Sequence, residues 1–370
     1  MTKRSVPFFD YPRAYLDDRD ELLKIIDDVG NRGAFIMQKD LMEFESTLAE
    51  YTGASHAIGV ANATDGLELS WMALGLRPGD EVIISSHTML ATASAIKTAG
   101  GTPVPVEIGE DNLIDPDAIE NAINPRTVGI MPTQLNGRTC NMDRIMSIAE
   151  KHNFFVVEDA AQALGSRFKG KHAGTFGHAA AISFFPAKVL GCLGDGGGII
   201  TNDSNLHDKL FQLHDHGRDV DGNVKSWGRN SRLDNLQAAI LNYRISEYDK
   251  IIERRRRIAT MYDERLRDLD ELQLPPAPST KSDHFDIYQN YELQSDKRDS
   301  LKKYLYENRI GTLIQWGGKA VHQWEHLGFT IKLPVVEKFF ERCIMLPMNM
   351  FVSDDDVNYV CDKIVEFYRK

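Results

Sequence analysis

The sequence predicts an α/β fold with a mostly parallel sheet, followed by a smaller α+β region. Two observations lead to this prediction. Short apolar, β-branched runs alternate with stretches of helical periodicity up to about residue 200, and longer helical patterns begin after residue 231. A repeated strand-then-helix order is typical of a parallel sheet that helices cover on both faces.

The elements can be placed in order along the chain. Buried strands are expected at residues 57–60, 81–84, 103–108, 128–131, 154–157, 180–184 and 198–201, with helices at 65–74, 89–98, 116–122 and 142–152. A long helix is expected to run through the basic residues 254–257. After the prolines at 275, 276 and 278, we expect strands at 287–293 and 312–316 and helices at 300–308 and 354–368. This gives a large α/β domain over residues 1–250 and a small α+β domain over residues 251–370.

Composition narrows the classes of function. The chain has 370 residues, and its 43 basic against 54 acidic residues give a formal net charge of −11, which argues against a nucleic-acid partner. No run reaches the ~18 apolar residues of a membrane span, and Asp10 interrupts any signal peptide, so we expect a cytoplasmic protein with no membrane partner. The cysteines lack close spacing, so neither a disulfide nor a metal site is expected.

Other local signals are weaker. The segment 165–171 has the outline of a phosphate-binding loop, but His172 follows it where a hydroxyl residue would be needed for magnesium. The glycines of 191–198 do not fall at dinucleotide-binding spacing. His214 and His216 lie two residues apart on an expected helix, so they point apart rather than toward one metal.

Two carboxylates end the apolar run at 154–157. Glu158 and Asp159 are placed where open α/β sheets bind ligands, beyond the carboxyl end of a strand. Asp159 with Gln162 three residues later also has the form of a helix-capping box. From these residues alone, both interpretations stay open.

One lysine stands inside a strongly apolar stretch, Ser183–Gly191. Lysine is rarely buried, and removal from water lowers its pKa, so the neutral amine of Lys188 becomes available as a Schiff-base nucleophile. The alternative is a lysine on a surface loop.

These residues together carry a family resemblance. The chain resembles the DegT/DnrJ/EryC1/StrS family of pyridoxal-phosphate sugar aminotransferases in three segments: Glu158-Asp159-x-x-Gln162, Ser183-Phe184-Phe185-Pro186-x-Lys188 and Gly194-Asp195-Gly196-Gly197. Further matches include Ala63-Thr64-Asp65 and Gly228-x-Asn230-Ser231-Arg232, and the likeness covers about residues 20 to 365 in consistent order. The resemblance implies the aspartate aminotransferase (fold type I) architecture, pyridoxal 5′-phosphate as cofactor and a homodimer with shared active sites.

The resemblance also implies roles for the catalytic residues. Lys188 would form the Schiff base and carry a proton between the substrate and the cofactor. Asp159 would pair with the protonated pyridine nitrogen, and Gln162 would bind the ring hydroxyl.

The phosphate of the cofactor has its own implied set of ligands. Thr64 and the backbone of Ala63 and Asp65 would hold it at a helix start, where amides and the helix dipole favour anions. Ser183 would add a hydroxyl, and Asn230 would reach the same phosphate from the partner subunit.

Departures from the family pattern bear on the substrate. Where relatives often stack an aromatic ring on the pyridine, this chain has Met89, whose thioether can pack on a ring. The segments 134–137 and 315–319 also differ from the family pattern where the acceptor would lie. The expected substrate-binding residues are His87, Asn136, Arg229, Trp316 and Lys319.

The implied reaction moves an amino group from L-glutamate or glutamine to a keto sugar, for a bacterial surface polysaccharide, lipopolysaccharide or related glycoside. Lys319 or Arg229 could meet a diphosphate or a carboxylate, so the acceptor is either a nucleotide-linked keto sugar or a keto-sugar acid such as 8-keto-3-deoxyoctulosonate. Two alternatives stay open. One is a sugar dehydratase, although dehydratases in this family replace the lysine by histidine; the other is a non-catalytic sugar-sensing or regulatory protein on the same scaffold.

Overall fold

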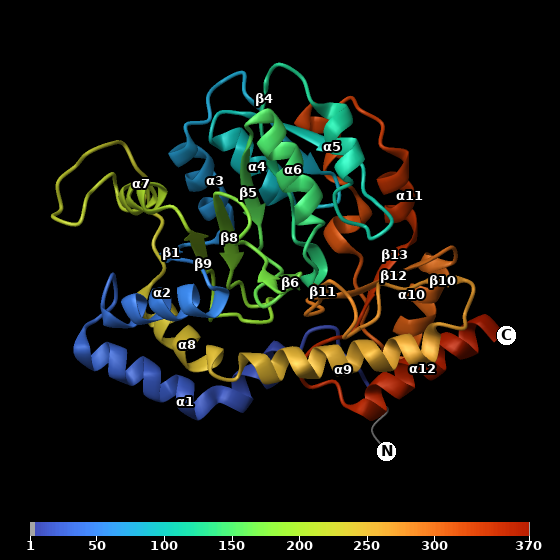
Figure 1. Cartoon of the computed structure of the whole chain (residues 1–370). Coiled ribbons are helices and arrows are strands. Elements are labelled where there is room, and N and C mark those ends of the chain that lie inside the picture. Colours follow the sequence, from blue (N-terminus) through green and yellow to red (C-terminus); the bar gives the residue numbers. More distant parts are fainter. Residues whose placement is uncertain (1–3, 370) are drawn as a thin grey trace.

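The computed structural model describes residues 4–369, and its centre is a seven-stranded sheet (Figure 1). The strands lie in the order β1-β9-β8-β5-β4-β2-β3. Their bounds are β1 (His56–Val60), β2 (Glu81–Ser85), β3 (Thr102–Val106), β4 (Thr127–Met131), β5 (Phe155–Asp159), β8 (Ala179–Ser183) and β9 (Gly197–Thr201). Only β9 runs antiparallel to the rest of this sheet. The predicted α/β class and all seven predicted strands are confirmed.

Helices cover both faces of the sheet because successive side chains of each strand point to opposite sides. In β5, Val156 packs with one buried cluster that includes residues of α5 (Pro116–Ala122) and α6 (Met142–His152). The next residue, Val157, packs with a second cluster from α3 (Ala63–Leu74) and α4 (Leu90–Thr98). The helix α7 (Ser204–His214) packs with α3 and β1.

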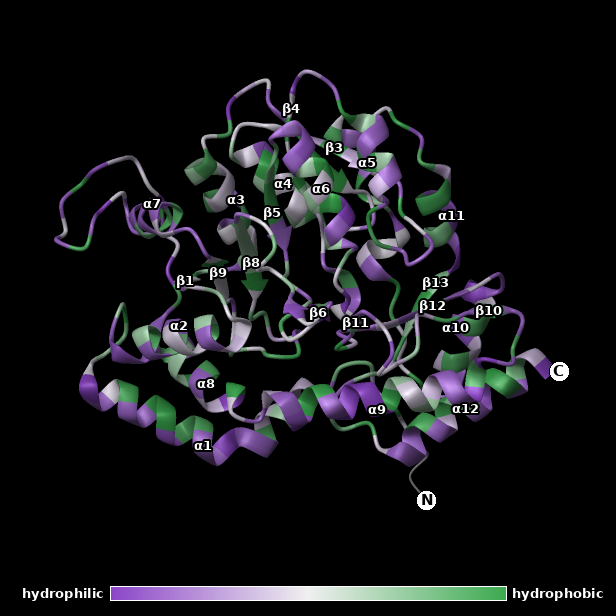
Figure 2. Cartoon of the chain, viewed as in Figure 1, coloured by the Kyte–Doolittle hydropathy of each residue, from purple (hydrophilic) through white to green (hydrophobic). Residues whose placement is uncertain are grey.

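A further helical layer lies below the sheet in the view of Figure 1, made of α1, α2, α8 and α9. Their bounds are α1 (Tyr11–Arg32), α2 (Lys39–Thr52), α8 (Asn235–Ile245) and α9 (Tyr248–Leu266). The sequence patterns do not single out α1 and α2, although Asp10 caps α1 by accepting from the backbone N–H of Arg13 and Gly33 ends it in a left-handed conformation. Apolar residues recur along α1 (Figure 2).

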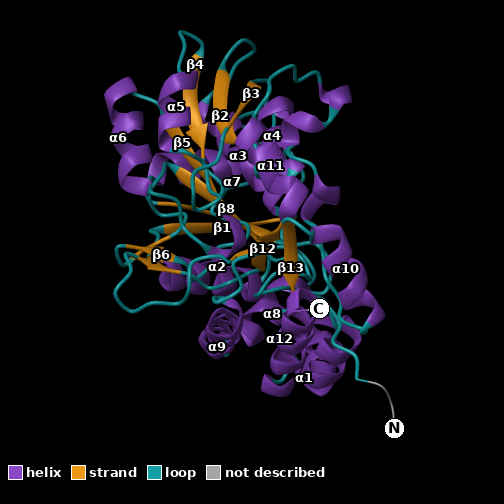
Figure 3. Cartoon of the chain, turned by 90° about the vertical axis from the view of Figure 1, so that its right-hand side faces the viewer, coloured by secondary structure: helices purple, strands orange, loops and turns teal. Residues whose placement is uncertain are grey.

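The C-terminal part carries its own three-stranded sheet, ordered β10-β12-β13, with α10, α11 and α12 around it (Figure 3). The bounds are β10 (Leu272–Gln273), β12 (Tyr291–Ser295), α10 (Arg298–Glu307), α11 (Pro334–Arg342), β13 (Cys343–Leu346) and α12 (Asp354–Arg369). A third small sheet joins β6 (Arg167–Phe168), β7 (Lys171–His172) and β11 (His284–Phe285). The boundary expected at residue 250 falls inside α9, so one continuous helix connects the two parts.

The predicted strand at 312–316 is wrong. Only Leu313 forms a bridge there, to Met345, and a 3-10 turn occupies Gln315–Gly318. The reason lies in the backbone, because Trp316 and Gly317 have φ of 47° and 70°, a left-handed conformation that a strand cannot contain.

Within residues 4–369, no helix is long and apolar enough to cross a membrane. The same residues contain no group of three or more His, Cys, Asp or Glu side chains arranged to hold a metal ion, and the four cysteines are free and buried.

Candidate active site

Asp159 ends β5, and its carboxylate is held in a buried position. Its Oδ2 atom accepts a hydrogen bond from the hydroxyl of Thr92 at 2.6 Å, and Oδ1 accepts from the backbone N–H of Ala161 at 3.2 Å. Burial raises the pKa of Asp159 above its ordinary value, and the hydrogen bonds from Thr92 and Ala161 and the charge of Lys188 offset this rise only in part. No helix follows Asp159, so the capping-box interpretation fails.

The neighbouring carboxylate, that of Glu158, has a structural role. Glu158 is fully buried and accepts four hydrogen bonds, from the Nε2 atom of Gln134 at 2.6 Å and from the backbone N–H groups of Gly174, Phe176 and Gly177 at 2.7, 2.7 and 2.8 Å. These partners leave it no free lone pair directed at a ligand. Of the two carboxylates at this strand end, Asp159 is therefore the candidate for chemistry and Glu158 holds the loop 174–177.

Gln162 is oriented through its carbonyl oxygen. Oε1 accepts from the backbone N–H of Asn136 at 2.9 Å and from Nδ2 of Asn290 at 3.4 Å. Since one end of the amide is fixed as an acceptor, the other end is left to donate to a ligand.

Lys188 lies in the turn after β8 and is partly buried. Burial lowers the pKa of Lys188 to about 8, against the opposing charge of Asp159. The peptide groups on both sides of it are bound by one side chain: Oε1 of Gln289 accepts from the N–H of Val189 at 3.0 Å, and Nε2 of Gln289 donates to the carbonyl of Ala187 at 3.0 Å. A cavity of about 700 Å³ borders this turn, between the start of α1, α8 and residues 348–351.

The start of α3 forms a cradle of backbone N–H donors beside β8 and β9. Asn62 caps the helix by accepting from the N–H of Asp65 at 2.9 Å, so the first-turn amides of Ala63 and Thr64 remain as donors. Gly197 makes this approach possible, because a Cβ atom there would lie 2.6 Å from the nitrogen of Ala63.

Ser183 lies next to this cradle because it is the register partner of Gly197. Its Oγ accepts from the N–H of Phe185 at 3.3 Å, which leaves the hydroxyl proton free to donate. The structure thus brings Ser183 to Ala63 and Thr64, whereas the amide of Asp65 is already bound by Asn62 and its carboxylate accepts from Ser231 at 2.7 Å.

Asn230 and Arg229 lie at the base of an arm, residues 215–230, that follows α7 and extends away from the rest of the molecule (Figure 1). The side chain of Asn230 is exposed, and Arg229 forms an ion pair with Glu68 on α3. Lys319 is also exposed and lies over the ring of Trp324, with Nζ 5.1 Å from the ring centroid. In this chain Arg229 and Lys319 thus each contact another side chain, Glu68 and Trp324 respectively.

Three of the expected substrate residues gather around Glu292, which the sequence patterns did not single out. Asn136 donates to its Oε2 atom at 2.7 Å, Nε2 of His87 lies 3.5 Å from the same atom, and the ring of Trp316 lies 5.7 Å from that of His87. The only sequence signal was a carboxylate inside the apolar run 287–293. Met89 is half exposed at the start of α4, next to Thr88, whose hydroxyl lies 2.6 Å from that of Thr92.

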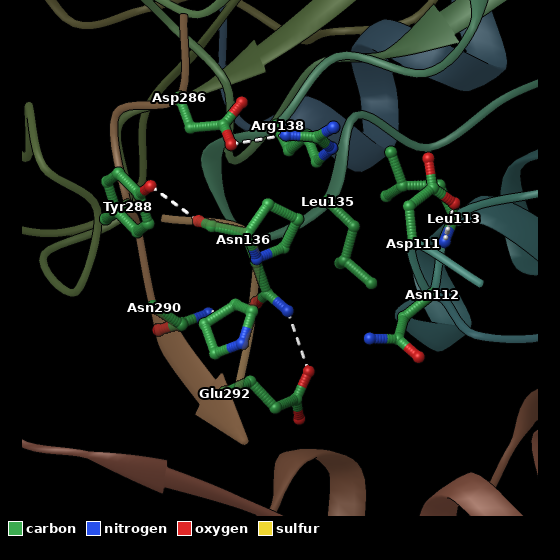
Figure 4. Close-up of a pocket in the computed structure, with 12 residues that line it drawn as sticks. Asp111, Asn112, Leu113, Leu135, Asn136, Arg138, Asp286, Tyr288, Asn290 and Glu292 are labelled. Carbon is green, nitrogen blue, oxygen red and sulfur yellow. Dashed lines mark hydrogen bonds and ion pairs between the residues drawn. The ribbon is translucent and has the colours of Figure 1, made fainter. Parts of the chain in front are cut away.

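A small pocket of about 40 Å³ with several polar side chains in its lining opens beside this group (Figure 4). It is lined by Asp111, Asn112, Leu113, Leu135, Asn136, Arg138, Pro275, Pro276, Asp286, Tyr288, Asn290 and Glu292. Arg138 is already paired with Asp286 at 2.6 Å, so the lining presents carboxylate and amide groups but no unpaired cation. Asn136 and Asn290 both bind Gln162, so the pocket borders the site that Asp159 and Lys188 define.

The chain was compared with known families and proteins. Residues 16–365 match the model of the DegT/DnrJ/EryC1/StrS aminotransferase family. Over 369 residues it is 36% identical to a pleiotropic regulatory protein of Geobacillus stearothermophilus, with 99% of each chain covered. Over 370 residues it is 35% identical to a dTDP-3-amino-3,4,6-trideoxy-α-D-glucose transaminase of Streptomyces venezuelae, covering 99% of this chain and 97% of the other.

The chain also has the same fold as solved structures of proteins with similar sequences. The fold matches that of S. venezuelae DesV in complex with a ketimine intermediate, with a TM-score of 0.95, 35% identity and complete coverage of both chains. It also matches a Bacillus subtilis protein with pyridoxamine phosphate bound as cofactor, with a TM-score of 0.91 and 28% identity over all of this chain and 86% of the other.

Proposed function

The chain belongs to the DegT/DnrJ/EryC1/StrS aminotransferase family, and from this premise we propose that it transfers an amino group from L-glutamate or L-glutamine to the ketone of a nucleotide-linked sugar. It is a pyridoxal-phosphate-dependent sugar aminotransferase. What carries the proposal is one arrangement: Asp159, buried and hydrogen-bonded at the end of β5, lies beside β8, and the turn after β8 carries Lys188, whose pKa burial lowers.

The residues present fit the cofactor. The amides of Ala63 and Thr64 and the hydroxyl of Ser183 form a donor-rich cradle, shaped by Gly197, that suits a phosphate group. Asp159 offers a carboxyl group for the ring nitrogen, with Thr92 and Ala161 favouring its ionised form, and the amide of Gln162 offers a donor for the ring hydroxyl. When bound, the cofactor supplies an aldehyde carbon to carry the amino group and a ring that withdraws electrons.

Asp159, Lys188 and Met89 would have different roles in the reaction. We propose that Asp159 keeps the ring nitrogen protonated, because its carboxylate is fixed by Thr92 and Ala161 and cannot turn away. Lys188 then takes and returns the proton at the substrate carbon, and its pKa of about 8 suits that exchange near neutral pH. Met89, at the start of α4, would pack against the ring.

The charges around the small pocket favour one class of acceptor. Three carboxylates, Asp111, Asp286 and Glu292, line it, and Arg138 is already paired. A carboxylate entering this lining would meet like charge, whereas sugar hydroxyls find acceptors. Because the pocket itself, at about 40 Å³, is too small for a hexose ring, the acceptor would lie at its mouth, and we therefore favour a neutral hexose there over a keto-sugar acid. The transaminase relative is named for a dTDP sugar aminated at C3, which makes a 3-keto hexose our first acceptor candidate.

We propose a homodimer for the active form. Large apolar side chains remain exposed along α1 and the segment that follows it, including Tyr15, Leu16, Ile26, Phe35 and Met42. The arm 215–230 adds Val220, Val224 and Trp227, which is 94% exposed. Such a surface is typical of a protein interface, and a second copy would cover it and bring the arm with Asn230 to the neighbouring site.

A regulatory role is the second candidate, because one relative is named as a regulatory protein. The intact set of Lys188, Asp159 and Gln162 favours catalysis. The test begins with the visible absorbance of the purified protein. L-glutamate or L-glutamine should bleach it, and a suitable keto sugar should restore it.

The acceptor panel should contain dTDP- and UDP-linked 3-keto hexoses and a keto-sugar acid. Restoration by a nucleotide-linked sugar alone supports the proposal. A protein that binds no cofactor, or that neither donor bleaches, would favour the regulatory role, and restoration by the sugar acid alone would overturn the acceptor class.

A further inference from the structure

The turn that carries Lys188 is held by a single side chain from the C-terminal part of the molecule. Gln289 precedes β12 and is 7% exposed. Its Oε1 accepts from the N–H of Val189 and its Nε2 donates to the carbonyl of Ala187, both at 3.0 Å. These two groups belong to the peptide bonds immediately before and after Lys188, so one planar amide fixes both peptides that flank it.

The backbone of Gln289 is fixed in turn. The guanidinium of Arg255 is buried and donates to the carbonyls of Gln289 at 2.6 Å, Tyr288 at 2.8 Å and Met348 at 2.8 Å. On the other side, Gly137 packs so closely that a Cβ atom there would lie 2.6 Å from the nitrogen of Gln289. The backbone of Gln289 is therefore held in place, and so is the starting point of the side-chain amide that binds the lysine turn.

The next residue points the other way. Asn290 donates to Oδ1 of Asn136 at 2.8 Å and lies 3.4 Å from Oε1 of Gln162. Two consecutive residues thus join the lysine turn on one side and the Gln162–Asn136 group on the other. Since their backbone is fixed, the position of Lys188 relative to Gln162 depends on this short segment.

We propose that Gln289 is a positioning residue, which directs the side chain of Lys188 by holding the two peptide groups that flank it. The inference rests on the proposed function, because it concerns the lysine of that same site. Without the clamp, the turn can sample other backbone conformations, and Lys188 spends less time within reach of the reacting carbon. Misplacement by about 1 Å is expected to cost about 100-fold in rate.

The test compares Gln289→Met with Gln294→Met. Methionine has nearly the length of glutamine but makes neither hydrogen bond. Gln294 is a matched control, since it is also 7% exposed and lies in β12. In Gln289→Met we expect kcat to fall by about 10- to 100-fold with the KM of the amino donor nearly unchanged, and no such change in Gln294→Met.

A second measurement does not depend on turnover. Pyridoxal phosphate is added to cofactor-free protein, and covalent attachment at Lys188 is timed by borohydride quenching and mass spectrometry. We expect attachment to slow at least about tenfold in Gln289→Met. If the wild type attaches the cofactor but aminates no sugar, the proposed function fails while the positioning role can still be judged.

Gln289→Glu keeps the proposal testable if the methionine variant unfolds. When the carboxyl group of this variant is ionised, one of its oxygens faces the carbonyl oxygen of Ala187 and the two acceptors repel each other. The protonated form can donate to that carbonyl, as the amide does. The ratio of kcat in Gln289→Glu to kcat in wild type should therefore rise as the pH falls. Unchanged kcat and attachment rate in Gln289→Met, or a pH-independent ratio in Gln289→Glu, would overturn the positioning role.

Discussion

The hydroxyl of Thr92 lies 2.6 Å from Oδ2 of Asp159 and joins α4 to the end of β5. Thr92 is also in contact with Thr88 at 2.6 Å, which is in contact with Thr133 at 2.7 Å. Because Asp159 can only accept when ionised, the proton of Thr92 must point toward it, and the hydroxyls of Thr88 and Thr133 then donate in the same direction. Three threonines thus favour the charged form of a carboxylate that burial alone would neutralise.

Replacement of Thr92 tests this arrangement. Thr92→Val removes a hydrogen bond that lowers the pKa of Asp159, so that pKa should rise further. A hydrogen bond to a charged group contributes about 1.5–3 kcal/mol, so we expect kcat/KM to fall by at least about tenfold. The acidic limb of the pH profile should move to higher pH. Thr98→Val, at the exposed end of the same helix, is the control, and an unmoved acidic limb in Thr92→Val would contradict the role of Thr92.

Asp159→Asn should separate chemistry from folding. The neutral amide cannot hold a proton on the ring nitrogen, so we expect a folded protein whose turnover falls by at least about a thousandfold. Circular dichroism and single-turnover absorbance measurements give the two readouts. Near-normal rates would show that the electron-withdrawing ring does not depend on Asp159.

Glu158→Gln should show the opposite pattern. Its carboxylate binds Gln134 and three backbone N–H groups of 174–177, and an amide group would turn an N–H toward one of those donors. We expect the free energy of unfolding to fall by about 2–4 kcal/mol, measured by urea denaturation. A loss of turnover as large as that of Asp159→Asn, with stability unchanged, would mean that the roles of the two carboxylates have been exchanged.

Lys188 makes the stability of the cofactor-free protein depend on pH. Its pKa is about 8 in the folded chain, because burial lowers it, and about 10.4 in an unfolded chain. Between these values the unfolded chain binds more protons, so the free energy of unfolding should rise with pH across that window. Well below pH 8, Lys188 is protonated in both the folded and the unfolded chain, so the cost of burying its charge lowers the free energy of unfolding by the full amount. The comparison is with Lys188→Met, and the stability gap between the two proteins should shrink from pH 8 to 10; a constant gap would contradict the lowered pKa.

Whether Asn230 acts in the active site of its own chain or in that of the partner can be tested by mixing two inactive variants. Lys188→Ala and Asn230→Ala should each be severely impaired. If Asn230 serves the partner's site, mixed dimers contain one intact site, and equal mixing should recover about a quarter of wild-type activity. If Asn230 serves its own chain, mixing recovers nothing. Subunit exchange is confirmed by native mass spectrometry of differently tagged chains.

The sequence predicted the elements and residues whose signals are local. Each of the seven strands is an apolar run, which is why the sequence predicts them correctly. The motif residues Asp159 and Ser183 end the neighbouring parallel strands β5 and β8, and Gln162 and Lys188 lie in the loops that follow them. The partners that fix them escaped prediction, since Gln289 contacts the lysine turn from 100 residues away in sequence and Glu292 meets Asn136 from 156 residues away. Such contacts depend on how the C-terminal sheet packs, which periodicity does not encode.

The strand predicted at 312–316 shows the same limit at the level of the backbone. Its residues have suitable composition, but Trp316 adopts φ of 47°, with its ring 5.7 Å from that of His87 and 6.2 Å from that of Phe340, and neither distant contact is encoded by the local pattern.

The first described residues pack against the C-terminal part of the molecule. Val6 pairs with Ile310 and lies in the buried cluster of the C-terminal part, and Arg4 forms an ion pair with Asp356 on α12. Cleavage of the chain at residue 250 would therefore separate the C-terminal sheet from a piece of its own core. A circular permutant that joins the two ends through a linker long enough to run along α12, and opens the chain in the arm 215–230, should keep that core intact, which offers a route to expression of the molecule with new termini.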